Sequence, residues 1–300
     1  MRRLYFEALL LMALSLVLIT TSGCGMMRSL ISPVIPKGPA LKKKVMVFPL
    51  VDQAGLGAER AEELDRGFWE FLKRSPDLLL YSPPDGMFSS LAMTSRLFGV
   101  VTSSRLIDIA EGLGMNALII GVMNPIEVTT RKSGIWPFRS YKKFYEISMG
   151  VNVVDITTKT FSMTRIESEE FSASLEDAEK QGDKEIIDQA LKEALPEILE
   201  GQASAVEDEL AKVPWTGRIL AVEDNTIMID AGKKVGVRPG QYFEVLSKGK
   251  SIPSGSGRTI RLLGERMGEI KVDSVMGKHS LAVPVKGGKF SAGQVVRFKR

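Results

Sequence analysis

The alternation of apolar and polar positions over residues 45–122 predicts a layered α/β arrangement. Residues 45–51 form a short apolar run typical of a buried strand. After it, apolar side chains recur at helical spacing and predict a helix whose buried face carries Ala61, Leu64, Phe68, Phe71 and Leu72. Strands are expected at 78–81 and 117–122. Between them we expect a helix that buries Leu106, Ile109, Ala110 and Leu113.

Residues 145–210 combine a two-residue alternation with a long helical pattern. One face of residues 145–153 is apolar, which predicts a half-buried antiparallel strand, and 160–171 is expected to return beside it. Residues 175–210 are predicted to be helical, with Pro196 kinking or dividing the helix. The apolar stripe of this helix consists of Ile187, Ala190, Leu191, Ala194, Ile198 and Leu199. We therefore predict a layered mixed sheet with helices on one face over residues 45–212.

From residue 213 onward, helix formers give way to short β-rich runs separated by glycine turns. Seven strands are expected, at 218–222, 226–230, 242–246, 261–263, 269–275, 281–285 and 295–298. Many short strands with glycine turns predict a small barrel or sandwich. The fold class predicted is thus α/β at 45–212, followed by a small all-β, barrel-like domain at 213–300.

The first residues have the parts of a secretory signal. Two arginines open the chain, residues 8–19 are almost wholly apolar, and small residues lead into Cys24. The alternative is a membrane-spanning anchor, which would need about twenty apolar residues. Glu7 and Thr20 cut the apolar run short. We therefore predict a signal peptide over 1–23.

Residues 21–24 (TSGC) resemble the bacterial lipobox, in which small residues precede a lipid-bearing cysteine, although Thr21 stands where leucine is commonest. The resemblance implies fatty acids such as palmitate on Cys24, and several acyl chains make a stable anchor. The alternative is an incidental thiol beside an ordinary cleavage site. Because Gly25 and not aspartate follows, the resemblance implies the outer membrane. Residues 24–44, with three prolines and a lysine run, are expected to be the anchor and a solvated linker.

Composition narrows the possible chemistry. The chain has 300 residues, of which 44% are hydrophobic and 25% charged, enough for one large domain or two ordinary ones. A net charge of +4, without a basic stripe interleaved with aromatics, gives no reason to expect nucleic-acid binding. One cysteine and one histidine, His279, cannot supply a disulfide or a Cys-based zinc site. We expect no cofactor, no metal and no catalytic residue.

Three patterns imitate functional motifs. Residues 55–60 (GLGAER) resemble half a dinucleotide fingerprint, but Arg60 replaces the third glycine, so a turn and a helix start explain them. Residues 140–143 and 247–250 both match S-x-x-K, yet neither opens a helix. The acidic run 167–170 is explained as a solvated strand. A glycosidase-type pair among the many carboxylates stays open, although none is singled out.

Several short motifs resemble the CsgG- and FlgT-type envelope proteins, which include the curli secretion channel and a flagellar H-ring component. The motifs are VMVFPL with a helix after it, ALIIG, VNVVDITT and, in the C-terminal region, residues 231–243 and 290–296. The resemblance implies a non-catalytic lipoprotein or periplasmic part of an assembly, often a ring. It does not extend to a membrane pore, because the strand at 160–171 carries Arg165 and three glutamates and could not face lipid.

Residues 131–143 (RKSGIWPFRSYKK) lie between two predicted strands and place large apolar side chains at a turn. Exposed aromatics ringed by arginine and lysine suit a protein hot spot or a membrane interface. The alternative is a loop folded back over the core of its own domain. The candidate partner-contact residues are Ile135, Trp136, Phe138 and Arg139.

Together these features predict a non-catalytic outer-membrane lipoprotein with its body in the periplasm. It would act as an assembly or scaffold component of an envelope machine, of flagellar-ring or secretion type. Two alternatives stay open: a periplasmic lipoprotein that regulates a cell-wall synthase, and a hydrolase with an unrecognised site. The expected partners are the membrane, through the N-terminal lipid, envelope proteins, and further copies of the chain in a ring.

Replacing the cysteine tests the predicted anchor. We expect a Cys24→Ser chain to lose its resistance to a carbonate wash, because acyl chains and not the leader hold the mature protein to the envelope. Sedimentation with envelopes and the size of the chain on a gel measure this. A Cys24→Ser chain that still sedimented with its leader intact would contradict the anchor.

Overall fold

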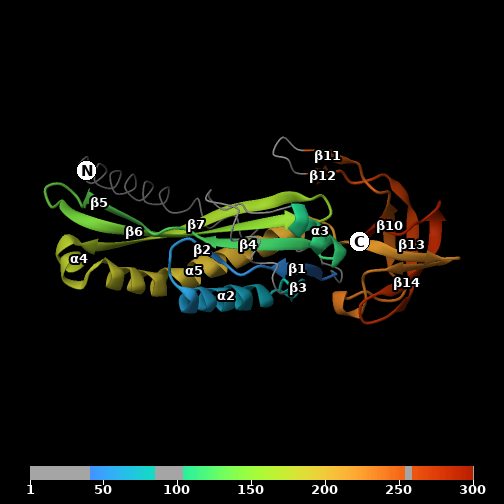
Figure 1. Cartoon of the computed structure of the whole chain (residues 1–300), viewed down its shortest axis with the longest axis horizontal. Coiled ribbons are helices and arrows are strands. Elements are labelled where there is room, and N and C mark those ends of the chain that lie inside the picture. The colour runs from blue at the N-terminus through green and yellow to red at the C-terminus, as the bar shows by residue number, and fades with distance from the viewer. Residues whose placement is uncertain (1–40, 85–103, 254–258, 300) are drawn as a thin grey trace, which may run out of the picture. The chain divides into compact units, whose positions relative to one another are not determined.

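The computed structural model describes residues 41–84, 104–253 and 259–299. The predicted signal peptide, Cys24 and most of the predicted linker lie outside these residues. The described chain belongs to one compact unit, which contains a seven-stranded sheet, its helices and a closed barrel (Figure 1). The predicted fold class is therefore confirmed.

The mixed sheet consists of β1 Lys43–Val47, β2 Val51–Asp52, β3 Leu78–Tyr81, β4 Ala117–Met123, β5 Glu127–Ser133, β6 Ser140–Asp155 and β7 Thr160–Ser174. Its strand order is β3-β1-β4-β6-β5, with β2 beside β4 and β7 beside β6. β1 runs parallel to β3 and β4, whereas β4, β5 and β7 pair antiparallel with β6. Because β4 and β5 occupy one side of β6, β7 takes the other side and forms an edge.

Two long helices cover one face of the sheet. α2 (Ala58–Lys73) buries Leu64, Phe68 and Leu72, which are spaced four apart and therefore share one face. α5 (Asp183–Lys212) packs beside it, and both helices join the main core with the inward side chains of β1, β4 and β6. This is the helical layer that the sequence predicted.

α3 (Ser104–Gly112) is the exception, because it packs on the opposite face of the sheet. It buries Leu106, Ile107 and Ala110 against the alternate side chains of β1 and β4. Ile109 and Leu113, predicted to be buried, are 37% and 47% exposed. The choice between Ile107 and Ile109 depends on which way the helix is turned against the sheet, and the apolar pattern of this short helix allows both.

The predicted long helix is divided at Gly182 and not at Pro196. α4 (Leu175–Gln181) ends where Gly182 adopts a φ of 85°, a conformation that side chains rarely allow. α5 then continues through Pro196. Leu195, Ile198 and Leu199 lie around the proline and are buried in the core, so packing stabilises the helix despite the lost backbone hydrogen bond.

The C-terminal strands close into a barrel in the order β10-β13-β14-β9-β8-β15. The strands are β8 Thr216–Glu223, β9 Thr226–Ile229, β10 Tyr242–Leu246, β13 Arg266–Val275, β14 Ser280–Gly287 and β15 Val295–Phe298. β11 (Ser251–Pro253) and β12 (Thr259–Arg261) form a separate two-stranded sheet. The predicted strand at 261–263 belongs to this small sheet, and the other six form the barrel.

Lys43 and Lys44, the first two residues of β1, are buried at the junction of the sheet and the barrel, although the sequence predicted a solvated linker. Lys43 and Lys44 are each 9% exposed. The Lys43 ammonium donates to the carbonyls of Leu210 and Val213, the latter at 2.6 Å. The Lys44 ammonium donates to the carbonyl of Asp230 at 2.8 Å and lies 3.5 Å from its carboxylate. These charges are satisfied by partners distant in sequence, and no local pattern reveals such partners.

Other contacts complete the junction. The Asn116 side chain accepts a hydrogen bond from the Lys44 amide at 2.8 Å and donates to the Thr216 carbonyl at 2.6 Å. The indole N–H of Trp215 donates to the Lys42 carbonyl at 3.0 Å. Leu41, just before β1, belongs to the core of the barrel. The start of β1 therefore contacts the sheet and the barrel together.

A cluster of charges at Glu111 joins α3 to β8 of the barrel and to β12 of the small sheet. Its carboxylate lies 2.5 Å from Arg218 and 2.8 Å from Lys159, and it also pairs with Arg261 of β12. Burial alone would raise the pKa of Glu111. Hydrogen bonds from Arg261 and Lys159, with the charge of Arg218, outweigh burial and lower the pKa from 4.5 to about 2.

The lowered pKa predicts acid sensitivity. Because the folded state holds Glu111 ionised, its stabilisation is present above pH 4.5 and is lost as the pH falls towards about 2. We expect Glu111→Gln to lower the free energy of unfolding at neutral pH and to flatten its fall in that window, measured by urea unfolding at several pH values. Glu179→Gln, at an exposed carboxylate of α4, should change neither the free energy of unfolding at neutral pH nor its fall at acid pH. Equal acid profiles for Glu111→Gln and the unsubstituted chain would contradict the role of this cluster.

Candidate functional site

The hairpin of β5 and β6 carries the predicted contact residues at its turn. The strands pair from Glu127 opposite Glu146 to Ser133 opposite Ser140. The turn is closed by a hydrogen bond from the Phe138 amide to the Ile135 carbonyl at 2.7 Å. Gly134 has a φ of 109°, and a Cβ there would lie 3.0 Å from the Phe138 carbonyl oxygen. Glycine is therefore required at the start of this turn.

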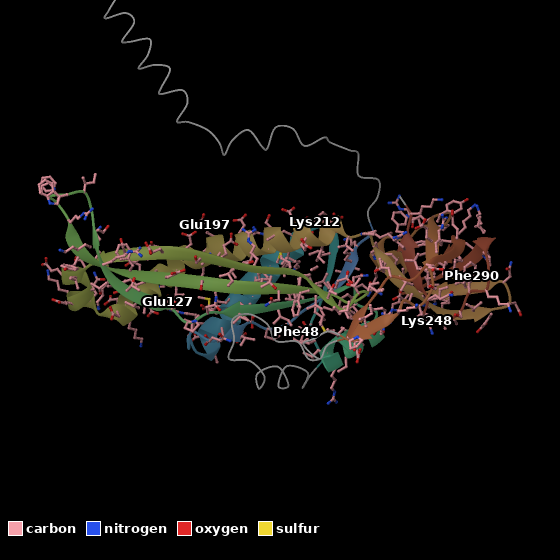
Figure 2. The ribbon with its side chains drawn as sticks, turned by 90° about the horizontal axis from the view of Figure 1, so that it is seen from above. Phe48, Glu127, Glu197, Lys212, Lys248 and Phe290 are labelled. Atoms are coloured by element: carbon pink, nitrogen blue, oxygen red, sulfur yellow. The ribbon has the colours of Figure 1, made fainter. Side chains whose placement is uncertain are left out.

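The apolar side chains of the turn are almost fully exposed. Ile135, Trp136 and Phe138 have exposed fractions of 85%, 80% and 86%. Figure 2 shows the side chains of the β5–β6 turn projecting away from the rest of the ribbon. The alternative of a loop folded back over its own core is therefore wrong. We call Ile135, Trp136 and Phe138 the apolar tip.

Five positive charges and no negative charge surround the apolar tip within residues 131–143. We call them the collar: Arg131, Lys132, Arg139, Lys142 and Lys143. Arg131 pairs with Glu170 and lies 3.8 Å from the centre of the Phe144 ring, and Lys143 lies 2.8 Å from Asp183. The other three have no ion-pair partner among the described residues. Arg139, a predicted contact residue, donates from its Nε to the Gly134 carbonyl at 3.3 Å.

The base of the hairpin is anchored in the fold. Tyr145 of β6 is fully buried and packs with Ala178 and Ile186 of the helical layer. Its hydroxyl donates to Asp183 at 2.7 Å. Burial and the hydrogen bond to this carboxylate raise the pKa of Tyr145, while hydrogen bonds from Lys143 and Tyr145 lower the pKa of Asp183. The tyrosine therefore remains a donor at neutral pH, and the hairpin leaves the sheet from a fixed base.

A row of carboxylates crosses the sheet behind the collar. Glu127 of β5 stands opposite Glu146 of β6, and Glu146 stands opposite Glu170 of β7. All three are exposed and lie on the same face of the sheet, because directly opposed residues share a face. The predicted acidic run 167–170 thus lies on the edge strand β7, where its charges are typical of protection against edge pairing.

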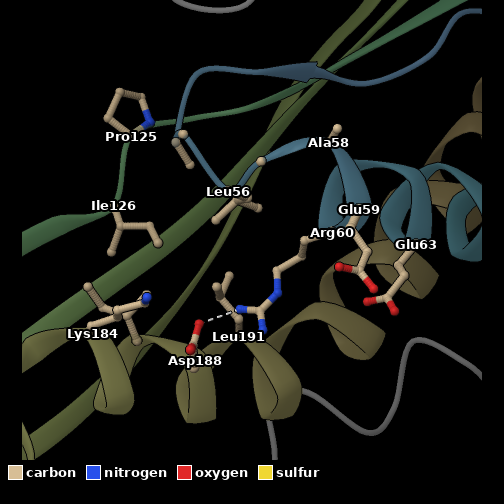
Figure 3. A pocket seen from close by; sticks show the side chains of 14 residues that line it. Leu56, Ala58, Glu59, Arg60, Glu63, Pro125, Ile126, Lys184, Asp188 and Leu191 are labelled. Atoms are coloured by element: carbon tan, nitrogen blue, oxygen red, sulfur yellow. Dashed lines mark hydrogen bonds and ion pairs between the residues drawn. The ribbon is translucent and has the colours of Figure 1, made fainter.

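A cleft lies at the start of α2, where the sequence imitates a dinucleotide fingerprint (Figure 3). It measures about 890 Å³ and lies between the residues 54–63 and α5. The Asp52 carboxylate accepts hydrogen bonds from the amides of Gly55 and Gly57, at 2.8 and 3.2 Å. Arg60 crosses the cleft to Asp188 at 2.5 Å. The amides that a phosphate would need are already occupied, which fits a turn and a helix start.

The remaining sequence candidates are separated from one another. His279 lies in the turn between β13 and β14, where its carbonyl accepts from the Met276 amide at 2.9 Å. Ser247 accepts a hydrogen bond from the Glu265 amide at 3.0 Å, and Lys143 of the other S-x-x-K match is bound to Asp183. Within residues 41–84, 104–253 and 259–299, no three His, Cys, Asp or Glu side chains gather as a metal site. No helix of that part is long and apolar enough to span a bilayer.

The sequence matches no known protein family and no curated protein. Among solved structures, the chain is similar to a hypothetical protein from Chlamydia trachomatis, at 18% identity over 57% of this chain and 95% of that one, with a TM-score of 0.33. It is also similar to the PelC dodecamer from Paraburkholderia phytofirmans, at 10% identity over 54% and 90%, with a TM-score of 0.30. A third similar structure is the C-terminal domain of LpoB from Salmonella enterica, at 15% identity over 46% of this chain and 87% of that one, with a TM-score of 0.23.

Other similar structures are described as bacterial lipoproteins, from Neisseria meningitidis and Acinetobacter baumannii, at 13% and 8% identity. The similarity to the Neisseria protein covers 57% of this chain and 99% of that one, with a TM-score of 0.26. The similarity to the Acinetobacter protein covers 57% of this chain and 93% of that one, with a TM-score of 0.27. TM-scores and identities this low carry no assignment of family or function. The CsgG- and FlgT-type resemblance therefore stays a prediction.

The exposure of the apolar tip predicts that the fold does not need it. We expect the double change Trp136→Ser and Phe138→Ser to alter the free energy of unfolding by less than about 0.5 kcal/mol, as is usual for exposed positions. Tyr145→Ala, at the buried base of the same hairpin, should cost about 3 kcal/mol or more. Urea unfolding of the three chains measures both. Global unfolding of the double variant would show that the tip supports the core.

Proposed function

We propose that this chain is a non-catalytic outer-membrane lipoprotein and an assembly or scaffold component of an envelope machine, of flagellar-ring or secretion type. The observation that carries the proposal is the apolar tip, held out on a hairpin with a fixed base. A soluble body rarely exposes three neighbouring large apolar side chains without a contact for them. Ile135, Trp136, Phe138 and Arg139 are the residues through which the body would engage another component of the envelope.

The proposed anchor is Cys24, acylated after removal of residues 1–23. Because β1 begins at Lys43 and Leu41 is already buried, the last residues of the predicted linker 24–44 belong to the folded body. The sheet with its helices and the barrel would be the two domains, 45–212 and 213–300, of a body in the periplasm. The extensive junction between them supports a body that acts as one rigid part.

Two other functions lead to different outcomes. A regulator of a cell-wall synthase would be a monomer that binds the synthase, whereas an assembly component would form larger complexes, including rings of its own copies. A hydrolase would show turnover that disappears when one defined carboxylate is removed. Electron microscopy of the purified protein, with an activity assay, separates these outcomes.

The proposal predicts that an envelope complex depends on the tip. We expect cross-linking in the cell to shift the unsubstituted chain into a species of high molecular mass, and Ile135→Ser, Trp136→Ser and Phe138→Ser together to abolish at least nine tenths of it. Immunoblotting of envelope fractions measures the shift.

A matched control removes exposed apolar side chains elsewhere. Leu220 and Val285 of the barrel are 49% and 51% exposed, so Leu220→Ser with Val285→Ser removes apolar surface without touching the hairpin. This variant should keep the complex. Equal complexes in the tip variant and the unsubstituted chain would overturn the role of the tip.

A further inference from the structure

We propose that the apolar tip inserts into the interface of an anionic lipid bilayer, with the collar bound to its headgroups. This inference rests on the proposed function, because it names the component that the tip engages. It is carried by the arrangement of three zones along one hairpin: the tip, the collar and the carboxylate row.

The first two zones match the layers of a bilayer surface. Interfacial elements bury their apolar side chains roughly 5–10 Å into the boundary between headgroups and acyl chains. Lys132 precedes Ile135 by three residues, which is about 10 Å along a strand at roughly 3.3 Å per residue. When the tip reaches the acyl boundary, this cation is level with the phosphates. Trp136 supplies the amphipathic ring that is enriched at that depth.

The charge of the hairpin favours an anionic surface over a neutral one. Residues 131–143 hold five cations and no carboxylate. Lys132, Arg139 and Lys142 have no ion-pair partner among the described residues, so they can bind a headgroup without breaking an ion pair there. Each Lys or Arg beside an anionic surface contributes a factor of about five to binding.

The third zone limits the depth of insertion. Glu127 lies eight residues before Ile135, about 25 Å along an extended chain at roughly 3.3 Å per residue. Glu146 lies in register beside it, and these two carboxylates would be repelled by the same headgroups that attract the collar, whereas Glu170 of the row is paired with Arg131. The change of sign along the hairpin therefore allows the tip to enter and keeps the rest of the sheet out.

The hairpin is built for the surface and not for crossing. Both faces of β5 carry polar or charged side chains, among them Thr129, Arg131 and Lys132, and a single hairpin leaves open edges whose backbone groups lipid cannot satisfy. A groove in a partner protein is the competing occupant. It would need to be apolar at its floor and acidic at its rim.

Fluorescence of Trp136 in the full, lipid-anchored chain tests the inference. The protein is reconstituted into vesicles of phosphatidylcholine alone or with phosphatidylglycerol, with lipids brominated at shallow acyl positions as quenchers. The Trp136→Phe chain supplies the background from the two other tryptophans, Trp69 and Trp215. We expect a blue-shifted, quenched Trp136 signal in anionic vesicles and at least a fivefold weaker insertion equilibrium in neutral ones.

Matched charge variants test whether the positive charges of the collar drive insertion. Lys132→Gln, Arg139→Gln and Lys142→Gln together should weaken insertion on the order of 100-fold, from about fivefold per charge. Lys233→Gln, Lys234→Gln and Lys278→Gln remove the same charge from the barrel and should leave insertion unchanged. Unquenched Trp136 in anionic vesicles, or equal quenching in both vesicle types, would overturn the inference.

The two proposals fail separately. If the tip variant loses the cross-linked complex while the Trp136 fluorescence is unchanged by both kinds of vesicle, the tip binds a protein. The proposed function then stands and the lipid partner falls. If Trp136 inserts while the complex does not depend on the tip, the lipid partner stands and the proposed role in assembly falls.

Discussion

The burial of Lys43 and Lys44 at the start of β1 is the constraint on which the rest of the body depends. Two ammonium groups lose their water there, and a buried charge without partners would cost several kcal/mol. Carbonyls at the end of α5 and Asp230 of the barrel supply those partners. The sheet, the long helix and the barrel must therefore meet at this one place. Asn116 and Trp215 add hydrogen bonds that join the sheet and the barrel at this place.

Apolar periodicity was sufficient to predict most of the elements. β3, β10 and β15 have the boundaries that the sequence predicted, because turn residues flank each apolar run. The division at Gly182 was missed, since a single glycine in a helical pattern is weaker evidence than a proline. Pro196 was predicted to kink or divide the helix, but the surrounding leucines and isoleucine stabilise it through contacts that only the folded sheet provides. Local rules placed the elements, and tertiary packing decided where two of them end.

The sequence identified the residues of the candidate site and could not show their exposure. An apolar turn is equally compatible with a projecting tip and with a loop over the core, and the difference lies in where the base of the hairpin is fixed. Tyr145 and Asp183 fix it through contacts between β6 and the helical layer. The carboxylate row was equally hidden, because it exists only through the register of three strands.

The junction also sets an order of events for the folding of the chain. The partner of Lys44 lies 186 residues further along, and the partner of Lys43 at Val213 lies 170 residues further along. The first strand must therefore wait for the end of α5 and for the residues after β9, and contacts so far apart in sequence form slowly. In the interval α2 is available to cover one face of β1, while the end of α5 and the barrel are not yet in place. The start of β1 therefore becomes native only after the long helix and the first two strands of the barrel have formed, and until then the chain must avoid aggregation.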